Sequence, residues 1–277
     1  MKIDIKSPRL YLFSSMLAAL PAIPLQLMAY LKAYDSTQTN YFFTNSPLPA
    51  IATVFSILSC LLAIVAIVLW KKDSISLNPP SGSLASFPAA LGFLVGGVVM
   101  LLSNTEKLTY ILPILCFLAA IYNGAIIFAG DRARTIVALI GFSAVIACIL
   151  FNGYYYFDAS LEMNAPLKVS MQMAFLAVMI YFISEIRFLL DIELPRVSLL
   201  ACAFTVGVGA LVAIPVPVAY LLGVFKPQGA VFTASLTAQI FDHPEYLAGA
   251  AVVLGAFISS AWKLCHAMTA KNGKEDA

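Results

Sequence analysis

Residues 164–196 read NAPLKVSMQMAFLAVMIYFISEIRFLLDIELPR. Between Lys168 and Glu185 this segment carries sixteen residues without a formal charge. In a helix that rises about 1.5 Å per residue, the two charges lie roughly 26 Å apart. The hydrocarbon core of a bilayer is about 30 Å thick. The two charges therefore mark the two faces of a membrane, and we expect the helix between them to span it.

The same length argument applies to further apolar segments, so the sequence predicts an all-α, polytopic integral membrane protein with eight transmembrane helices. Their expected ranges are 10–31, 47–70, 84–103, 108–129, 135–152, 165–190, 197–224 and 246–264. The composition agrees, because 61% of the residues are hydrophobic and 11% are charged, against about 25% charged in a soluble domain. We expect a single transmembrane domain over 1–277 and no soluble domain.

Eight crossings place both termini on the same side of the membrane. With that side cytoplasmic, the inner segments hold twelve Lys and Arg residues and the outer segments four, namely Lys32, Lys107, Lys168 and Lys226. This asymmetry follows the positive-inside rule. We therefore expect a plasma-membrane protein with cytoplasmic N- and C-termini. The run at 10–31 is longer than the apolar core of a signal peptide, about 7–15 residues, so we expect it to stay as the first helix.

The two halves resemble each other weakly, which suggests two parallel four-helix repeats at 1–130 and 131–277. Asn45-Ser46-Pro47-Leu48 opens the second expected helix, and Asn164-Ala165-Pro166-Leu167 opens the sixth. In both places Asn or Ser suits the helix cap and Pro suits the first turn. The alternative is that helix starts resemble one another for this reason alone.

Two of the expected helices contain prolines that should interrupt them. These are Pro21 and Pro24 in the first helix, and Pro215 and Pro217 in the seventh. Proline lacks an N–H, so each one frees a backbone carbonyl, and broken transporter helices use such carbonyls to hold ligands. The alternative is that neighbouring helices satisfy the freed groups, which makes proline tolerable in membrane helices generally.

Five polar residues are candidates for a ligand site. Asn164, Lys168 and Gln172 recur every fourth residue and share one face of the sixth helix, where they would meet a ligand from outside. Tyr122 and Asn123 in the fourth helix are candidates to line a cavity between the first, sixth and seventh helices. The structural alternative is that Asn164 caps the helix, Lys168 reaches the outer surface and Gln172 bonds a neighbouring helix.

Ionisable residues deep within a span would indicate an ion path, and we expect essentially none. Glu185, Arg187 and Asp191 lie at the inner end of the sixth helix, where Arg187 and Asp191 are one turn apart. We interpret them as an inner-face cluster of ion pairs. The alternative is a gate or a contact with a partner.

The sequence gives little support for enzymatic chemistry. Gly141-Phe142-Ser143-Ala144 lacks the second glycine of a nucleophile elbow, and the chain has no HExxH helix and no phosphate-binding GxxxxGK[ST] loop. Pro244 interrupts the run Asp242, His243 and Glu245, so we expect no metal site and no cofactor. The net charge of +2 is too small to indicate the basic surface that a nucleic-acid-binding protein needs. An intramembrane enzyme is a third, disfavoured alternative.

These features favour a membrane protein that handles or transports a small neutral or lipidic ligand. The alternative is a non-catalytic scaffold or accessory subunit of a membrane complex, which would dock through Glu185–Arg196. The expected partners are the lipid bilayer, and either another membrane protein or a separate ATPase subunit if transport is driven by ATP.

Overall fold

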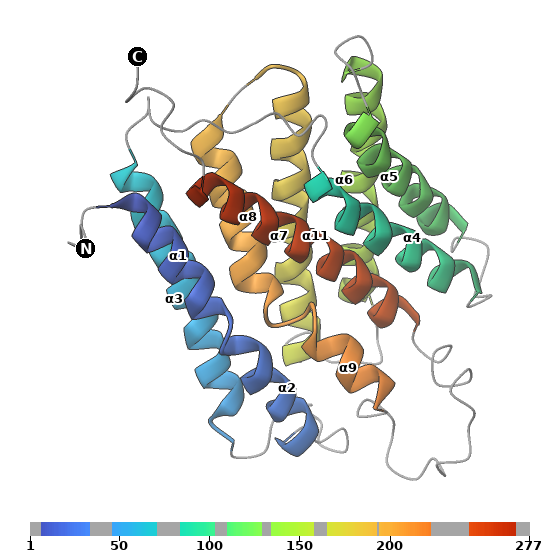
Figure 1. The fold of residues 1–277 in the computed structure, drawn as a ribbon. Helices are drawn as coiled ribbons and strands as arrows, with labels where there is room; N and C mark the ends of the chain where they lie inside the picture. Colours follow the sequence, from blue (N-terminus) through green and yellow to red (C-terminus); the bar gives the residue numbers. More distant parts are fainter. Residues whose placement is uncertain are drawn as a thin grey trace, which may run out of the picture.

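The computed structural model describes residues 7–33, 46–70, 84–102, 110–128, 134–157, 165–192, 194–222 and 244–269. These ranges are helical and contain no strand. The elements are α1 (Pro8–Ala19), α2 (Ala22–Ala33), α3 (Leu48–Leu69), the 3-10 helix η2 (Leu84–Ser86), α4 (Phe87–Leu102), α5 (Ile111–Phe128), α6 (Arg134–Phe157), α7 (Pro166–Leu189), α8 (Pro195–Gly209), α9 (Pro215–Leu221) and α11 (Pro244–Thr269). Figure 1 shows them packed in one bundle, in which successive segments alternate in direction.

Seven segments of the described chain are long and apolar enough to cross a membrane. They are Pro8–Ala33, Leu48–Leu69, Leu84–Leu102, Ile111–Phe128, Arg134–Phe157, Pro166–Leu189 and Glu245–Met268. The shortest has 18 residues, which make about 27 Å of helix and nearly match the hydrocarbon core. The predicted all-helical architecture with several apolar spans is confirmed, with seven candidate spans rather than eight.

The segment expected to form one helix at 197–224 forms two shorter helices. α8 ends at Gly209, and turns at 210–214 separate it from α9. Proline has no N–H and its ring clashes with the preceding turn, so Pro215 and Pro217 stop the helix from running through. α8 alone has 15 residues, about 22 Å, which is too short to cross the hydrocarbon core.

Two helices end later than the sequence predicted, α6 at Phe157 rather than near 152 and α11 at Thr269 rather than near 264. Tyr155 explains the extra turn of α6, because its ring lies 5.7 Å from that of Phe175 and its hydroxyl donates to the Glu245 carbonyl at 2.6 Å. The aromatic run that was expected in an outer loop therefore forms the last turn of α6.

The bundle exposes many large apolar side chains, and the buried face of α3 is made of small residues. Val68, Phe128 and Leu139 are 75%, 87% and 71% exposed. The buried face of α3 consists instead of Ala52, Ser56, Ser59, Ala63 and Ala66. Lipid tails are as apolar as leucine, so helices in a membrane expose large apolar residues and pack through small ones. The exposed faces are therefore suited to contact lipid.

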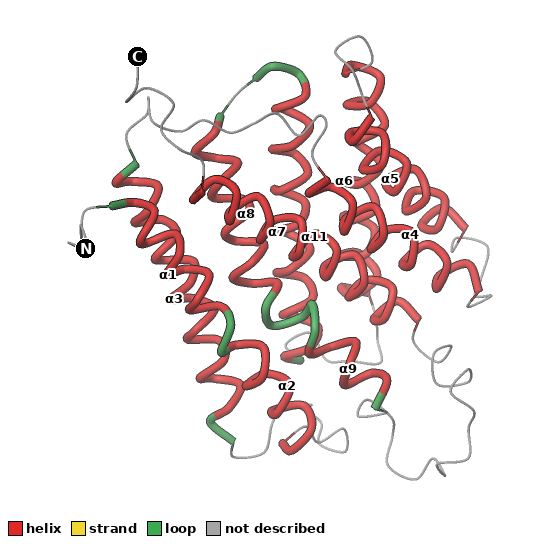
Figure 2. Tube along the Cα trace, in the orientation of Figure 1, coloured by secondary structure: helices red, strands yellow, loops and turns green. Residues whose placement is uncertain are grey.

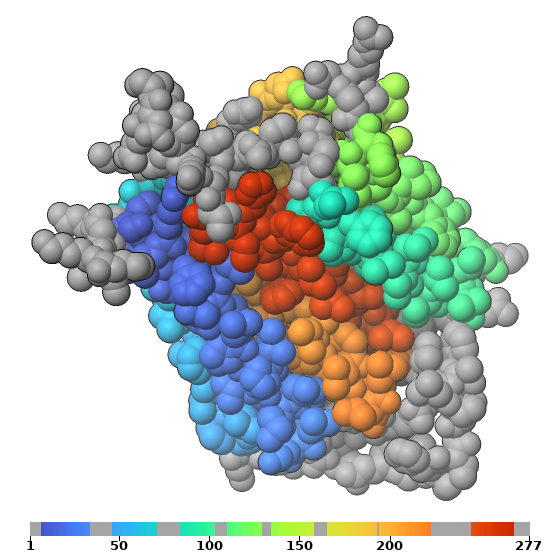
Figure 3. Space-filling view, in the orientation of Figure 1, coloured from blue at the N-terminus to red at the C-terminus, as the bar shows by residue number. Residues whose placement is uncertain are grey.

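Glycines bring α4 and α11 into close contact near the centre of the face drawn in Figure 3. A Cβ atom added at Gly92 would lie 2.6 Å from the carbonyl oxygen of Ala251 and 3.0 Å from Cα of Gly255. At Gly96 it would lie 3.0 Å from the carbonyl oxygen of Ala248. The Gly92-xxx-Gly96 face thus serves packing within the chain, and α11 is its partner.

The hypothesis of two parallel repeats stays a prediction. The interrupted segment α1–α2 is the first of the half 1–130, whereas α8–α9 is the third of the half 131–277. The interruption therefore does not recur at the same position in the two proposed repeats.

We expect Gly92→Ala to lower the free energy of unfolding by about 1–3 kcal/mol, because the added methyl group overlaps the backbone of α11 and overpacking costs about this much. Gly124→Ala is the matched control, since nothing lies within 4 Å of a Cβ atom built there. Thermal unfolding in detergent measures both variants. Equal melting temperatures for the two would contradict this packing.

Candidate functional site

Two interrupted helical segments lie side by side in the bundle. α1 packs against α8 and α2 packs against α9, so the turn at 20–21 and the turns at 210–214 lie at a similar level, drawn green between the helices in Figure 2. All four prolines that the sequence singled out lie at these interruptions: Pro21 in the first turn, Pro24 in α2, and Pro215 and Pro217 in α9.

The interruption between α8 and α9 leaves buried backbone carbonyls without donors. In a continuous helix the N–H groups at 215 and 217 would bond the carbonyls of Leu211 and Ala213, and proline supplies neither. Ala213 itself donates to the Gly209 carbonyl at 2.7 Å. Leu211 is 9% exposed and Ala213 is fully buried. No backbone donor from the described ranges reaches either carbonyl.

Buried hydroxyls line the neighbouring helices on the inner side of this interruption. Ser56 donates to the Gly207 carbonyl at 2.8 Å, and Ser15 lies 3.3 Å from Ser59. Thr205 on α8 bonds the carbonyl of Ala177 on α7 at 3.2 Å. These bonds join α1 to α3, and both α3 and α7 to α8, through small uncharged groups, as membrane helices commonly do.

A buried ion pair connects α7 with α11. The Lys263 ammonium donates to the Glu185 carboxylate and, at 2.9 Å, to the hydroxyl of Tyr181. The side chains of Lys263 and Glu185 are only 14% and 6% exposed. Ionisable groups inside a membrane bundle are costly unless they are paired, and their presence marks a functional candidate.

Tyr122 on α5 faces the same two charges. Its hydroxyl is fully buried and has no hydrogen-bond partner within the described part of the chain. Gly141 on α6 makes room for the ring, since a Cβ atom there would lie 2.7 Å from Tyr122 Cε2. An unpaired buried hydroxyl costs about 1–3 kcal/mol. Tyr122 therefore offers one free polar group beside the ion pair.

The expectation of essentially no buried ionisable group is wrong for this pair. The last helix was expected to end at 264, which would place Lys263 at the membrane surface. α11 continues to Thr269, so Lys263 lies about 9 Å before its end. The spacing of Tyr181 and Glu185 could have indicated the site in the sequence. The two residues are four positions apart and therefore share one face of α7.

We expect Glu185→Gln and Lys263→Met each to lower the free energy of unfolding by about 3–5 kcal/mol, because each leaves the other charge buried and unpaired. The double variant should lose less than the sum of the two. Arg134→Gln is the control, since it breaks a more exposed pair worth about 0–1 kcal/mol. Thermal unfolding measures all four proteins, and single variants no less stable than the control would contradict a buried pair.

The structure does not gather the predicted ligand residues into one site. Lys168 is 1% exposed and Gln172 is half-buried, both on α7 towards its first turns. Tyr122 lies near Glu185, about 20 Å along α7 from Gln172. Asn123 donates to the carbonyl of Ala119 in its own helix at 2.8 Å. Asn164 lies outside the described residues.

The other two residues of the predicted inner cluster lie at the end of α7. Asp191 accepts from Arg134 of α6 at 2.9 Å, and Arg187 is exposed. Asp191 has φ 57°, and its N–H and that of Ile192 bond the carbonyls of Phe188 and Arg187. This is a Schellman cap, in which a left-handed residue ends the helix. Glu185 is turned towards Lys263 and belongs to the bundle interior.

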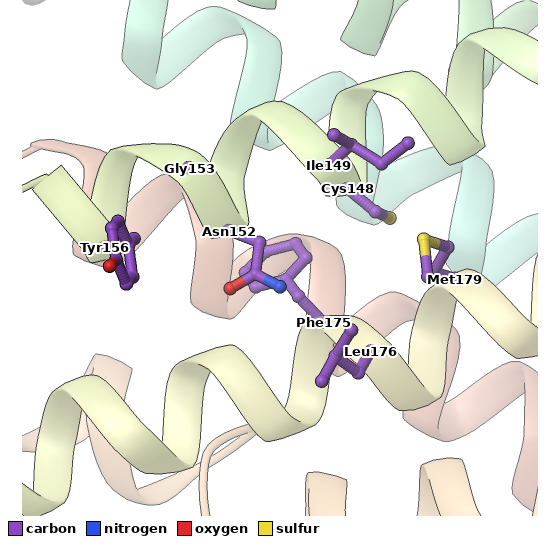
Figure 4. A pocket seen from close by; sticks show the side chains of 8 residues that line it. All are labelled: Cys148, Ile149, Asn152, Gly153, Tyr156, Phe175, Leu176 and Met179. Carbon is purple, nitrogen blue, oxygen red and sulfur yellow. The ribbon is translucent and has the colours of Figure 1, made fainter.

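A pocket of about 310 Å³ lies between α6 and α7, as Figure 4 shows. Its lining residues are Cys148, Ile149, Asn152, Gly153, Tyr156, Phe175, Leu176 and Met179. Most of these side chains are apolar, and Asn152 brings an amide group into the lining. Its volume is at the lower end of the range for ligand pockets, about 300–1,000 Å³.

The fold and these groups define the class of the chain as an α-helical protein with several candidate membrane spans, a buried ion pair and interrupted helices. No family model, no curated protein and no solved structure matches it. Over the described ranges, no three His, Cys, Asp or Glu side chains are grouped closely enough to hold a metal ion. Asp242 and His243 lie outside those ranges.

Proposed function

We propose that the chain crosses the membrane eight times, with α8 and α9 together as the seventh crossing. The two helices have 15 and 7 residues, about 33 Å of helix when joined end to end. α8 begins beside the end of α3, where Arg196 donates to the Trp70 carbonyl, and α9 packs against α2. Irregular backbone at membrane depth is tolerated where protein covers it, and the turn at 210–213 is buried.

An even number of crossings supports the proposed orientation. In Figure 1 the start of α1 and the end of α11 lie towards the same side of the bundle. The side on which α1 begins carries Arg9, Arg134, Arg187, Arg196 and Lys263. The opposite side carries Lys32 and Lys168 within the described segments. The positive-inside rule places the first side, with both termini, in the cytoplasm of a plasma-membrane protein.

Reporter fusions in a bacterial host test this topology. We expect green fluorescent protein fused after Ala277 to fluoresce, because it folds in the cytoplasm. Alkaline phosphatase fused after Leu222 should be active, because that end of α9 is outside. An active phosphatase fused after Ala277 would contradict eight crossings.

The proposed activity is the binding and movement of a small neutral or lipidic ligand across this bundle. The observation that carries it is the pair of adjacent interrupted segments, where the carbonyls of Leu211 and Ala213 are buried without a backbone donor from the described residues. Transporters place interrupted helices around their substrate sites for the polar groups that unwound backbone supplies. Carbonyls and hydroxyls are uncharged, so they suit a neutral polar group.

Purified protein in lipid vesicles tests movement with two probes. Fluorescent phosphatidylcholine reports exchange between leaflets through bleaching by dithionite, and light scattering reports glycerol entry. We expect at least one rate to exceed that of protein-free vesicles about tenfold. The double variant Pro215→Ala/Pro217→Ala should reduce it at least threefold, since it returns two N–H groups to the freed carbonyls.

Pro195→Ala is the matched control for this experiment. Pro195 is in the first turn of α8, where the helix needs no N–H donor, so the rate should not change. If neither probe moves faster than in empty vesicles, the proposal of transport is wrong for both ligand classes.

The accessory-subunit role is the alternative, and one observation favours it. Arg187 is exposed at the end of α7, and its guanidinium has no partner among the residues that the structure describes. Under this alternative, Arg187→Ala releases a protein that co-purifies from the native membrane and leaves both vesicle rates unchanged. Glu185 cannot belong to such a docking surface, because its side chain is buried against Lys263.

A further inference from the structure

The pocket between α6 and α7 opens on a surface that is suited to lipid. Its neighbours on α6 and α7 are exposed apolar side chains, among them Phe142 (48%), Ile146 (44%), Met173 (50%) and Ile180 (45%). The pocket is therefore continuous with the surface that the proposed topology presents to the bilayer. In the proposed topology the pocket therefore faces lipid, and its lining residues determine which chemical group it binds.

The position of Asn152 along α6 sets the depth of the pocket. α6 has 24 residues, about 36 Å of helix, which exceeds the hydrocarbon core by about 3 Å at each end. Asn152 is five residues before Phe157, about 8 Å from the end of the helix. Its amide therefore lies about 5 Å below the outer boundary of the hydrocarbon, close to the level of the glycerol esters of a phospholipid.

The amide of Asn152 needs a partner that the described chain does not supply. This side chain forms no hydrogen bond to a described residue, and Figure 4 shows it pointing from α6 into the space beside Phe175 of α7. An amide in hydrocarbon without a partner costs several kcal/mol. Because the NH₂ group can donate two hydrogen bonds, an ester carbonyl at this depth would satisfy it.

The shape of the pocket suits one acyl chain. Cys148 and Tyr156, at opposite ends of its α6 wall, are eight residues or about 12 Å apart. The volume of about 310 Å³ holds roughly ten groups of the size of a water molecule, at about 30 Å³ each. Phe175 and Met179 close the inner wall. This is room for one segment of a single chain below the amide.

We propose that this pocket is a binding site for an ester-linked phospholipid of the outer leaflet. One acyl chain occupies the pocket, and its ester carbonyl accepts a hydrogen bond from Asn152, while Tyr156 lies at the outer end beside the headgroup. The inference rests on the proposed membrane placement and names the lipidic ligand class of the proposed function.

The experiment compares two phosphatidylcholines that carry the same photoreactive diazirine in one chain. One has ester linkages and the other has ether linkages, which lack the carbonyl. The purified protein is placed in nanodiscs with either probe and illuminated, and mass spectrometry quantifies labelling of peptides from 148–157 and 175–179. We expect the ester lipid to label them about three- to tenfold more, the range that one hydrogen bond within a membrane provides.

Three variants test whether the labelling depends on Asn152 and on the space in the pocket. Asn152→Leu should remove the preference for the ester lipid and keep some labelling, because the apolar walls are unchanged. Leu176→Trp should fill the pocket and suppress labelling by both probes. Ile136→Trp is the matched control, since Ile136 is 65% exposed on the same helix outside the pocket, and it should behave as the unchanged protein does.

Equal labelling by the two lipids in the unchanged protein would overturn the proposal, and so would a preference that persists in Asn152→Leu. The ratio of the two probes is measured on one preparation, so partial misfolding of a variant does not imitate the result. Lipid movement in vesicles is a separate readout. An ester preference without lipid movement keeps the site and rejects lipid transport, whereas lipid movement without the preference rejects the site alone.

Discussion

In a bilayer the backbone has no water to bond, so every buried N–H and C=O depends on the protein for a partner. Most of this chain meets that constraint by forming helices that close their own hydrogen bonds. The exception is the turn at 210–214, which packs against other helices instead of facing outward. A Cβ atom added at Gly209 would lie 3.3 Å from the Phe257 ring of α11, so α11 contacts the end of α8 immediately before this turn.

The same constraint explains how side chains are distributed. Alanine, glycine and serine occupy the contacts between helices, since these small residues let backbones approach and leave few polar atoms unpaired. The buried carboxylate of Glu185 has its partner on a different helix, in Lys263. The interior therefore has an uncharged part at the interruption between α8 and α9, and a charged part nearer the C-terminal ends of α7 and α11.

The sequence predicted the spans well, because a long apolar run has few other stable environments, and its prolines indicated where helices stop. It placed helix ends poorly. Tyr154–Phe157 belong to α6 because Tyr155 bonds the Glu245 carbonyl, 90 residues away in the chain. The spacing of apolar residues within one helix indicates which of its side chains face the bundle interior. It does not indicate which other helix packs against that face. The Glu185–Lys263 pair and the pocket at Asn152 both depend on that second fact, so neither could be found from periodicity alone.

The ion pair also has a consequence for how the protein is made. Glu185 is 78 residues ahead of Lys263, so α7 leaves the ribosome and enters the membrane while its counter-ion has not yet been synthesised. α11 later packs against α1, α4, α7, α8 and α9 and supplies both the missing ammonium and the glycine face that α4 requires. A chain that lacks α11 therefore has a carboxylate on α7 without its counter-ion and leaves the glycine face of α4 uncovered.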